Sequence, residues 1–266
     1  RTARKIKRIS LDNTVTAIKG TVEAETDISL KIRESLIAEV EQHLSHDAYY
    51  EWNANIGGII VQLRTNVKHL HEFWIDNWYP AELESDLEPH AIIYAVSGIA
   101  GREPRAFYNA ESRTGIIINC DSYDQVRRWA LGVVTDVIER QAETHTIHGA
   151  CIDFHGKALA IVAPPGVGRG TLCYGLLQSD KARIHSNDCF FVRYTPKEAI
   201  ADISERKFYV RTRVARSYPY LAPLFDRSKL ENVVTSKDDC LNTECENLED
   251  CDLDRGETHC YWASKY

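Results

Sequence analysis

The stretch from residue 163 to residue 171 constrains the fold of this chain more than any other. Its sequence, APPGVGRGT, is rich in glycine and proline. It follows the apolar run 157–162, which we expect to be a buried strand, and it precedes residues 172–177, which we expect to begin a helix. A strand, a glycine-rich turn and a helix in this order are typical of a phosphate-binding loop, where backbone N–H groups converge on an anion.

The loop departs from the common pattern G-x-x-x-x-G-K-[ST], in which the lysine contacts phosphate and the hydroxyl binds Mg²⁺. Ala163 stands at the first glycine, Arg169 at the lysine and Gly170 at the hydroxyl, while a hydroxyl follows one place later in Thr171. Arginine keeps the charge but replaces a compact ammonium with a planar fork. An ordinary turn without a ligand is the alternative. If the loop binds phosphate, we expect the contacts from Gly166, Val167, Gly168, Arg169, Gly170 and Thr171.

Two short motifs flank the loop. His148 and Gly149 lie about fifteen residues before it, and Asn187 and Asp188 lie about seventeen residues after it, ahead of the strand-like run 189–194. Together with the loop, these motifs resemble the kinase domain of HPr kinase/phosphorylase and its relatives, whose fold is akin to that of PEP carboxykinase. The resemblance covers about residues 145–235, roughly a third of the chain.

The resemblance implies roles for individual residues. His148 matches a histidine beside the phosphate site, Arg169 takes the place of the lysine, and Asp188 matches the second of two acids. In the family one acid is the general base on the acceptor hydroxyl and the other helps to hold metal. Because Asn187 replaces the first acid, Asp188 is either the base or, with Thr171, a ligand of Mg²⁺.

The family also implies the ligands. They are ATP or ADP with Mg²⁺, and an acceptor that bears a hydroxyl group, either a protein serine or a small metabolite. A phosphoryl-transfer enzyme is therefore the first expectation. A nucleotide-binding regulator without turnover is the second, because the loop lysine, the usual Mg²⁺ hydroxyl and the first acid are all replaced.

Apolar periodicity organises the first 144 residues into an α/β domain to which we assign no role. The clearest helix is 123–140, whose apolar residues fall on one side. The other expected helices are 28–44 and 67–78, and the expected strands are 56–63, 90–96 and 115–118.

The end of the chain, residues 236–266, is rich in cysteine. Cys240, Cys245, Cys251 and Cys260 follow the spacing C-x4-C-x5-C-x8-C, with His259 beside the last. Four thiols in a short polar segment suggest zinc or an iron–sulfur cluster. Free or redox-paired thiols are the alternative, because the C-x2-C pairs of common zinc modules are missing. A metal-sensing or redox protein with a purely structural loop is thus a third possible function.

Composition limits the remaining classes. The formal net charge of −7 argues against nucleic acid as the main partner. No run of eighteen apolar residues is present, so we expect no membrane span. A chain with a nucleotide-binding loop is expected to be cytoplasmic, and a homo-oligomer is left open. The sequence predicts an α/β fold with an N-terminal α/β domain (1–144), an HPr kinase-like nucleotide-binding domain with mixed sheets (145–235, or as far as 266) and a cysteine-rich tail (236–266).

Overall fold

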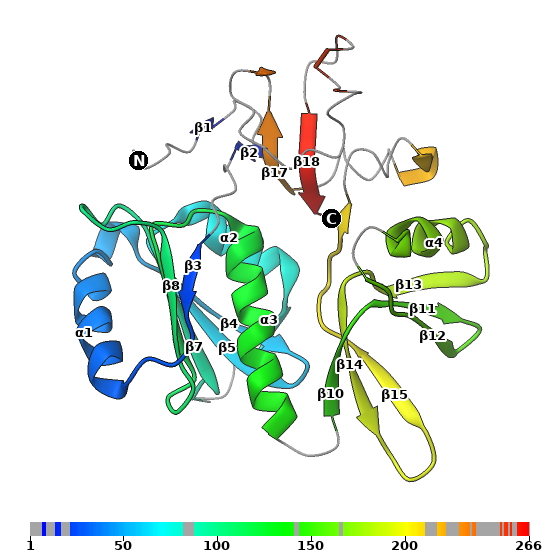
Figure 1. Cartoon of the computed structure of the whole chain (residues 1–266), viewed down its shortest axis with the longest axis horizontal. Helices are drawn as coiled ribbons and strands as arrows, with labels where there is room; N and C mark the ends of the chain where they lie inside the picture. Colours follow the sequence, from blue (N-terminus) through cyan, green and yellow to red (C-terminus); the bar gives the residue numbers. More distant parts are fainter. Residues whose placement is uncertain are drawn as a thin grey trace. The chain divides into compact units, whose positions relative to one another are not determined.

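The structure is a computed structural model of the 266-residue chain. Contacts between residues divide the chain into two compact units (Figure 1), one formed by Val22–Phe208 and the other by Arg1–Thr21 with Tyr209–Tyr266. The structure describes residues 7–8, 14–16, 22–81, 88–140, 144–164, 167–210, 217–221, 229–234, 236–237, 251, 253–254, 256 and 260–265.

A mixed seven-stranded sheet is the centre of the larger unit, so the fold is mixed α/β. The strand order is β3-β8-β9-β7-β5-β4-β6, in which β5, β7 and β9 run parallel and β8 runs antiparallel to β9. The predicted strands 56–63, 90–96 and 115–118 fall on β5, β7 and β9. The strands are β3 (Glu23–Glu25), β4 (Tyr50–Ile56), β5 (Ile59–Thr65), β6 (Tyr79–Pro80), β7 (Ala91–Val96), β8 (Arg105–Asn109) and β9 (Thr114–Ile118).

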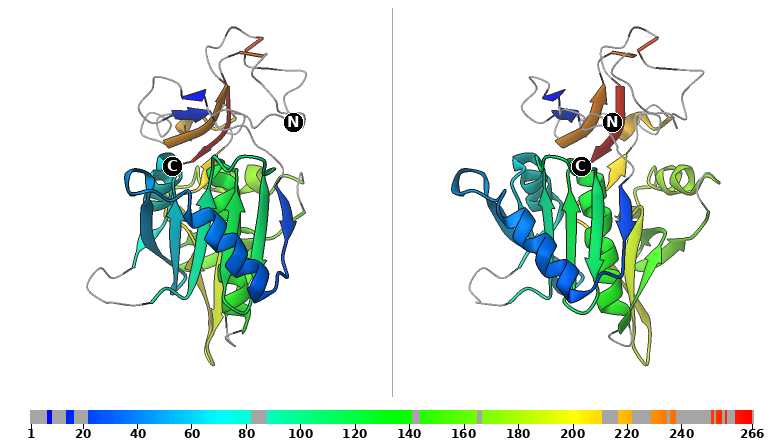
Figure 2. Two further views of the ribbon diagram at one scale, coloured as in Figure 1. Left: turned by 90° about the vertical axis from the view of Figure 1, so that its left-hand side faces the viewer. Right: turned by 60° about the vertical axis from the view of Figure 1, so that its left-hand side comes forward.

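Helices cover both faces of this sheet (Figures 1 and 2). Helix α1 (Leu30–Glu41) packs through Leu36 and Val40 on the face that presents Tyr94. Helices α2 (Lys68–Asn77) and α3 (Tyr123–Arg140) lie on the opposite face, where the packing is close enough to place Gly115 near Val133. The three helices predicted from apolar periodicity are therefore confirmed, α1 and α2 with shorter bounds. A 3₁₀ turn, η1 (His46–Ala48), follows α1.

A bent antiparallel ribbon follows α3. Its first half pairs β10 (Thr144–His148) with β14 (Cys189–Tyr194), and its second half pairs β11 (Ala150–Phe154) with β13 (Ala182–Ser186). The bend falls between the two halves, at Gly149 on one side and at residues 187–188 on the other. Strand β15 (Ala199–Ile203) adds to β14, and β12 (Lys157–Ile161) adds to β11.

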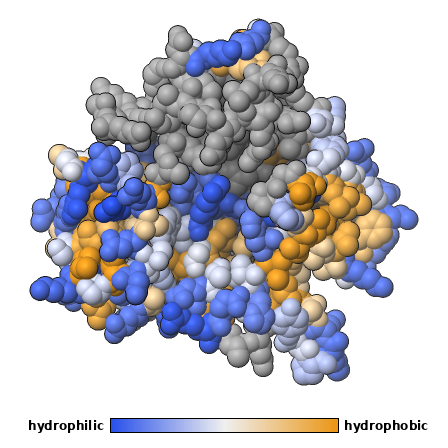
Figure 3. Space-filling model, viewed as in Figure 1, coloured by the Kyte–Doolittle hydropathy of each residue, from blue (hydrophilic) through white to orange (hydrophobic). Residues whose placement is uncertain are grey.

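The strand, loop and helix predicted around residue 163 are present as β12, the loop and α4 (Arg169–Leu176). The helix begins three residues earlier than we expected. Our expectation that the strand is buried is wrong, because β12 is an edge strand that pairs with β11 alone among the described strands, and Leu159 is 44% exposed. Apolar atoms gather on the surface of this part of the unit (Figure 3), which includes Leu159, Val162 and Leu172.

The smaller unit joins the two ends of the chain in one five-stranded sheet of order β1-β2-β17-β18-β16. Strand β2 pairs in parallel with β17, so segments more than two hundred residues apart become neighbours, which periodicity along the sequence does not indicate. No helix in the described part of the chain is long and apolar enough to cross a membrane. The elements are β1 (Lys7–Arg8), β2 (Thr14–Thr16), β16 (Tyr209–Val210), η2 (Pro219–Leu221), β17 (Lys229–Val234) and β18 (Cys260–Lys265).

Candidate functional site

Asp188 lies at the bend of the ribbon, in the short turn that connects β13 to β14. The hydroxyl of Ser186 accepts hydrogen bonds from the backbone N–H groups of Asp188 and Cys189, at 3.4 and 3.3 Å, and donates one to the carbonyl of Cys189. Ser204 donates a second hydrogen bond to that carbonyl. The turn is therefore held by side-chain hydrogen bonds on its inner side, and this fixes the place from which the Asp188 carboxylate projects.

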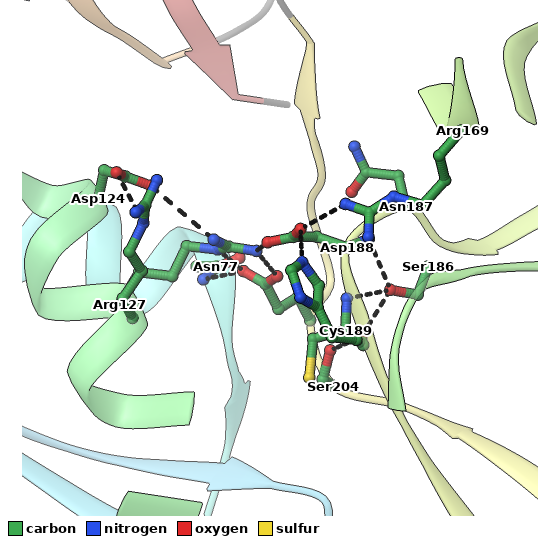
Figure 4. A network of polar contacts seen from close by, with 12 residues as sticks. Asn77, Asp124, Arg127, Arg169, Ser186, Asn187, Asp188, Cys189 and Ser204 are labelled. Atoms are coloured by element: carbon green, nitrogen blue, oxygen red, sulfur yellow. Dashed lines mark hydrogen bonds and ion pairs between the residues drawn. The ribbon is translucent and has the colours of Figure 1, made fainter. Parts of the chain in front are cut away.

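Two arginines, labelled in Figure 4, and one histidine surround this carboxylate. Its Oδ1 atom lies 3.0 Å from Nη2 of Arg169 and 3.3 Å from Nε2 of His148. Its Oδ2 atom lies 2.9 Å from Nη2 of Arg127. The structure thus brings together His148, Arg169 and Asp188, the three residues predicted to be catalytic, although they come from β10, α4 and the β13–β14 turn.

Arg127, on α3, was not predicted. Its side chain is 2% exposed and binds both carboxylate oxygens of Glu205, with Nε 2.7 Å from Oε1 and Nη2 2.6 Å from Oε2. The amide of Asn77 donates a hydrogen bond of 2.8 Å to Oε1 of Glu205. Oδ1 of Asp124 lies 3.8 Å from Nη1 of Arg127. The only signal in the sequence was an arginine on the otherwise apolar side of a helix.

Charge determines the ionisation of Asp188. Burial on its own raises the pKa of this carboxyl, but the charge and hydrogen bond of Arg127 outweigh that effect, so the net pKa lies below its usual range. Asp188 is therefore ionised at neutral pH and is a weak base. An ionised carboxylate of low basicity suits charge stabilisation or metal binding better than proton abstraction.

The loop meets this cluster at the start of α4. Gly168 is the N-cap of the helix, with a φ of 93°, and no side chain caps the helix there. Positive φ favours glycine, so a side chain at this position would strain the turn. Arg169 is the first helical residue, and its side chain is 20% exposed and directed at Asp188 (Figure 4). Val167 and Thr171 are exposed, and Gly166 lies outside the described residues.

Asn187 occupies the position at which the resembling family has its first acid. Its amide donates a hydrogen bond of 3.0 Å to the hydroxyl of Tyr174 on α4. The contact connects the β13–β14 turn to the helix that begins with Arg169. An amide in this position contributes no charge to the site, and this leaves Asp188 as the acid of the pair.

The metal predicted for the cysteine-rich tail stays a prediction. Cys240, Cys245 and His259 lie outside the described residues, and Cys251 is a free thiol. Among the residues that the structure describes, no group of three or more His, Cys, Asp or Glu side chains is placed to hold a metal ion.

Three buried cysteines lie on the elements that carry the candidate site, on β11, α4 and β14. Cys151, Cys173 and Cys189 are at most 7% exposed. Burial raises the pKa of Cys173 to about 11 and that of Cys189 to about 12, so these thiols stay protonated at neutral pH and behave as small apolar residues.

Comparison of the chain with models of protein families gives no match, and comparison with curated proteins gives none.

Proposed function

We propose that this protein binds a nucleotide and transfers a phosphoryl group from ATP or ADP to a hydroxyl, in the manner of the HPr kinase-like, PEP carboxykinase-like class. One observation supports this above the others. His148 and Arg169, each from a different motif, lie 3.3 and 3.0 Å from the same carboxylate oxygen of Asp188, although forty residues separate His148 from Asp188.

The phosphate end of the site suits an anion. The first turn of an α-helix has backbone N–H groups without helical partners, and the helix dipole favours negative charge there. At α4 this turn begins with a glycine that lacks a side-chain cap, and a guanidinium follows directly. Arg169 would bind a phosphate oxygen with the bidentate geometry that guanidinium groups favour.

The part of the site around Asp188 suits a metal ion that binds together with the phosphate groups of a nucleotide. Mg²⁺ usually takes one or two carboxylates, phosphate oxygens and several waters. Asp188 supplies one ionised carboxylate, whereas the side chain of Glu205 is 5% exposed and bound on both oxygens by Arg127. Asp188, with Thr171 at the loop, would hold the ion, and the bound ion supplies charge neutralisation at the phosphate oxygens.

In this proposal the residues of the chain act mainly by position and charge, as phosphoryl transfer requires. Arg169 orients the phosphate, and Asp188, whose Oδ2 atom is already bound by Arg127, uses Oδ1 to hold the ion rather than to contact the acceptor hydroxyl. The side chain of His148 is 70% exposed, and its Nε2 atom lies 3.3 Å from Oδ1 of Asp188. The ring can therefore contact a ligand on the solvent-facing side of the cluster. A protein serine and a small metabolite are both compatible acceptors, and we expect the enzyme to act in the cytoplasm.

A regulator that binds nucleotide without turnover is the second candidate. The observation that favours it is that both oxygens of Asp188 are bound to arginines, which lowers its basicity. Asn187 and Gly170 also lack the acid and the hydroxyl that active relatives carry at those places. The two candidates share a binding site and differ in turnover.

Calorimetric titration with ATP and ADP, with and without Mg²⁺, tests binding. We expect Arg169→Ala to weaken binding about a hundredfold, as the loss of a charged hydrogen bond to phosphate does. Arg183→Ala is the matched control, because Arg183 is an exposed arginine on β13 that bonds backbone carbonyls. Absence of binding by the wild-type protein would refute both candidates. Binding without phosphoryl transfer to any hydroxyl acceptor in a screen would favour the regulator.

A further inference from the structure

We infer that Arg169 and Asp188 hold each other in the nucleotide-free protein and exchange partners when a nucleotide binds, while Arg127 keeps Asp188 in place as a positioning residue. The inference rests on the proposed function and adds to it a regulation of the same site. The phosphate takes Arg169 away from Asp188, and the divalent cation that accompanies the nucleotide replaces Arg169 at the freed carboxylate oxygen.

The two oxygens of Asp188 are held in different ways. Oδ2 contacts Arg127, which is 2% exposed and fixed by two further hydrogen bonds to Glu205. Oδ1 contacts Arg169 and His148, which are 20% and 70% exposed. The inner contact is therefore part of the packed interior, and the outer contact is more accessible to a ligand.

The same guanidinium cannot serve the carboxylate and a phosphate fully at once. Arg169 is the first residue of α4, so its backbone already lies where an anion would bind the helix N-terminus. In the free protein its side chain is instead paired with Asp188 at 3.0 Å. Binding of a phosphate at the loop must therefore compete with an existing charge-assisted hydrogen bond, and this competition lowers the affinity for a bare anion.

Charge balance determines which form of the ligand relieves this competition. Arg169 is the guanidinium partner of Oδ1 of Asp188, and Arg127 is the guanidinium partner of Oδ2 of Asp188 and of Glu205. A metal-free nucleotide that takes Arg169 leaves Oδ1 of Asp188 without its guanidinium partner. A nucleotide that brings a divalent cation supplies the anion for Arg169 and the cation for Oδ1 together. The Arg169–Asp188 pair of the nucleotide-free protein thus makes the site selective for a nucleotide that carries a divalent cation.

Arg127 makes the exchange possible because it does not move in it. Its bonds to Glu205 keep one guanidinium beside Oδ2 after Arg169 leaves. Asp188 then stays ionised and keeps its orientation, with Oδ1 directed outward. Without Arg127, the departure of Arg169 would leave the carboxylate with no guanidinium contact and only its 3.3 Å contact with His148 among these three side chains.

The test compares ADP binding in EDTA and in excess Mg²⁺ for the wild-type protein and for Asp188→Asn. The amide has nearly the same size, and Arg127 keeps its two bonds to Glu205, so the variant should fold, which thermal melting verifies. We expect Mg²⁺ to strengthen binding to the wild-type protein. In EDTA, Asp188→Asn should bind ADP about tenfold more tightly than the wild type, a size typical of coupling free energies. Mg²⁺ should then add little.

The outcomes separate the two claims. If the wild-type protein binds ADP but Asp188→Asn binds metal-free ADP equally well or less well, the exchange is wrong and the proposed function stands. If neither protein binds ADP with or without Mg²⁺, the proposed function fails and the exchange fails with it.

A second measurement avoids any change at Asp188. Side-chain NMR signals of Arg169, assigned by their loss in Arg169→Gln, report on its partner directly. Addition of ADP with Mg²⁺ should shift the signals of Arg169 and leave those of Arg127 in place. Bound ADP with unchanged Arg169 signals, or with a shift at Arg127 instead, would overturn the exchange.

Discussion

The backbone N–H of Gly149 donates a hydrogen bond of 2.9 Å to the backbone carbonyl of Asp188, at the point where both strands of the ribbon bend. The His-Gly motif and the acidic motif are therefore the two sides of a single structural feature. His148 and Asp188 come together because the bend brings their strand ends together, and the lack of a side chain at Gly149 permits the close approach of the Ile161 carbonyl. Gly149 thus has a structural role at the bend, and His148 and Asp188 contribute their side chains to the candidate site.

Gly149→Ala should destabilise the protein by about 1–3 kcal/mol, as overpacking at a tight contact does. An added Cβ would lie 2.9 Å from the carbonyl oxygen of Ile161, which is backbone and cannot turn aside. Chemical denaturation measures the change in the free energy of unfolding. Gly132→Ala is the control, because Gly132 lies in the middle of α3 with no atom within 4 Å of an added Cβ. That variant should be neutral or slightly stabilising.

Arg127→Met should destabilise the protein by about 3–5 kcal/mol, because it removes the guanidinium that compensates the charge of a buried carboxylate. Glu205 has a side chain that is 5% exposed, and Arg127 binds both of its oxygens. The double variant Arg127→Met/Glu205→Gln should recover part of the loss, since the uncompensated charge is gone.

Arg140→Met is the matched control for this prediction. Arg140 is the last residue of α3, and its side chain is 62% exposed and pairs with Asp136 at the surface. We expect a change of less than about 1 kcal/mol, as for other exposed ion pairs. Equal effects of the two single variants in denaturation experiments would show that the buried cluster contributes no more than a surface pair.

The helices and strands whose apolar residues recur at a regular spacing were predictable from the sequence. Three helices and three strands follow from apolar periodicity, and the order of strand, loop and helix follows from the glycine-rich stretch. The burial of β12 was mispredicted because an apolar run such as 157–162 looks the same in an edge strand and in a central one. Flanking strands make that difference, and they depend on the tertiary fold.

The site was predictable to the extent that its residues lie in motifs. His148, Arg169 and Asp188 were found because each stands in a short pattern with chemical meaning. Arg127 and Glu205 stand in no such pattern, and seventy-eight residues separate them. A buried ion pair of this kind depends on the packing of α3 beside the end of β15, which no local rule specifies.

The pKa of Asp188 leads to a prediction for the dependence of stability on pH. Its folded-state pKa is lowered, so the stabilisation it provides is complete well above the unfolded value of about 3.9 and is lost as the pH falls through the folded value. The wild-type protein should therefore be more stable than Asp188→Asn at pH 7. The difference should shrink as the pH falls below about 4. Denaturant titrations of both proteins between these limits measure it, and a difference that grows on acidification would contradict the lowered pKa.

Gly57, in the turn between β4 and β5, provides a test of how the ribbon is packed against the large sheet. It has a φ of +61°, and an added Cβ would lie 2.6 Å from two ring carbons of Phe191 on β14. Phe191 is 1% exposed, so its ring has little room to move. Gly57→Ala should therefore incur both backbone strain and a steric clash, and we expect a loss of about 2–4 kcal/mol in the free energy of unfolding.

The neighbouring Gly58 separates these two effects. It also has positive φ, at +88°, but an added Cβ would meet no atom within 4 Å. Gly58→Ala should show the strain alone, about 1 kcal/mol, when it is measured in the same denaturation experiment. The excess loss in Gly57→Ala then measures the clash with Phe191, and Phe191→Leu in the Gly57→Ala background should relieve part of it. If the two glycine variants were equally stable, the turn and the ribbon would not be in contact in solution. Asp188 would then not be held against Arg127 of α3 in the way that the candidate site requires.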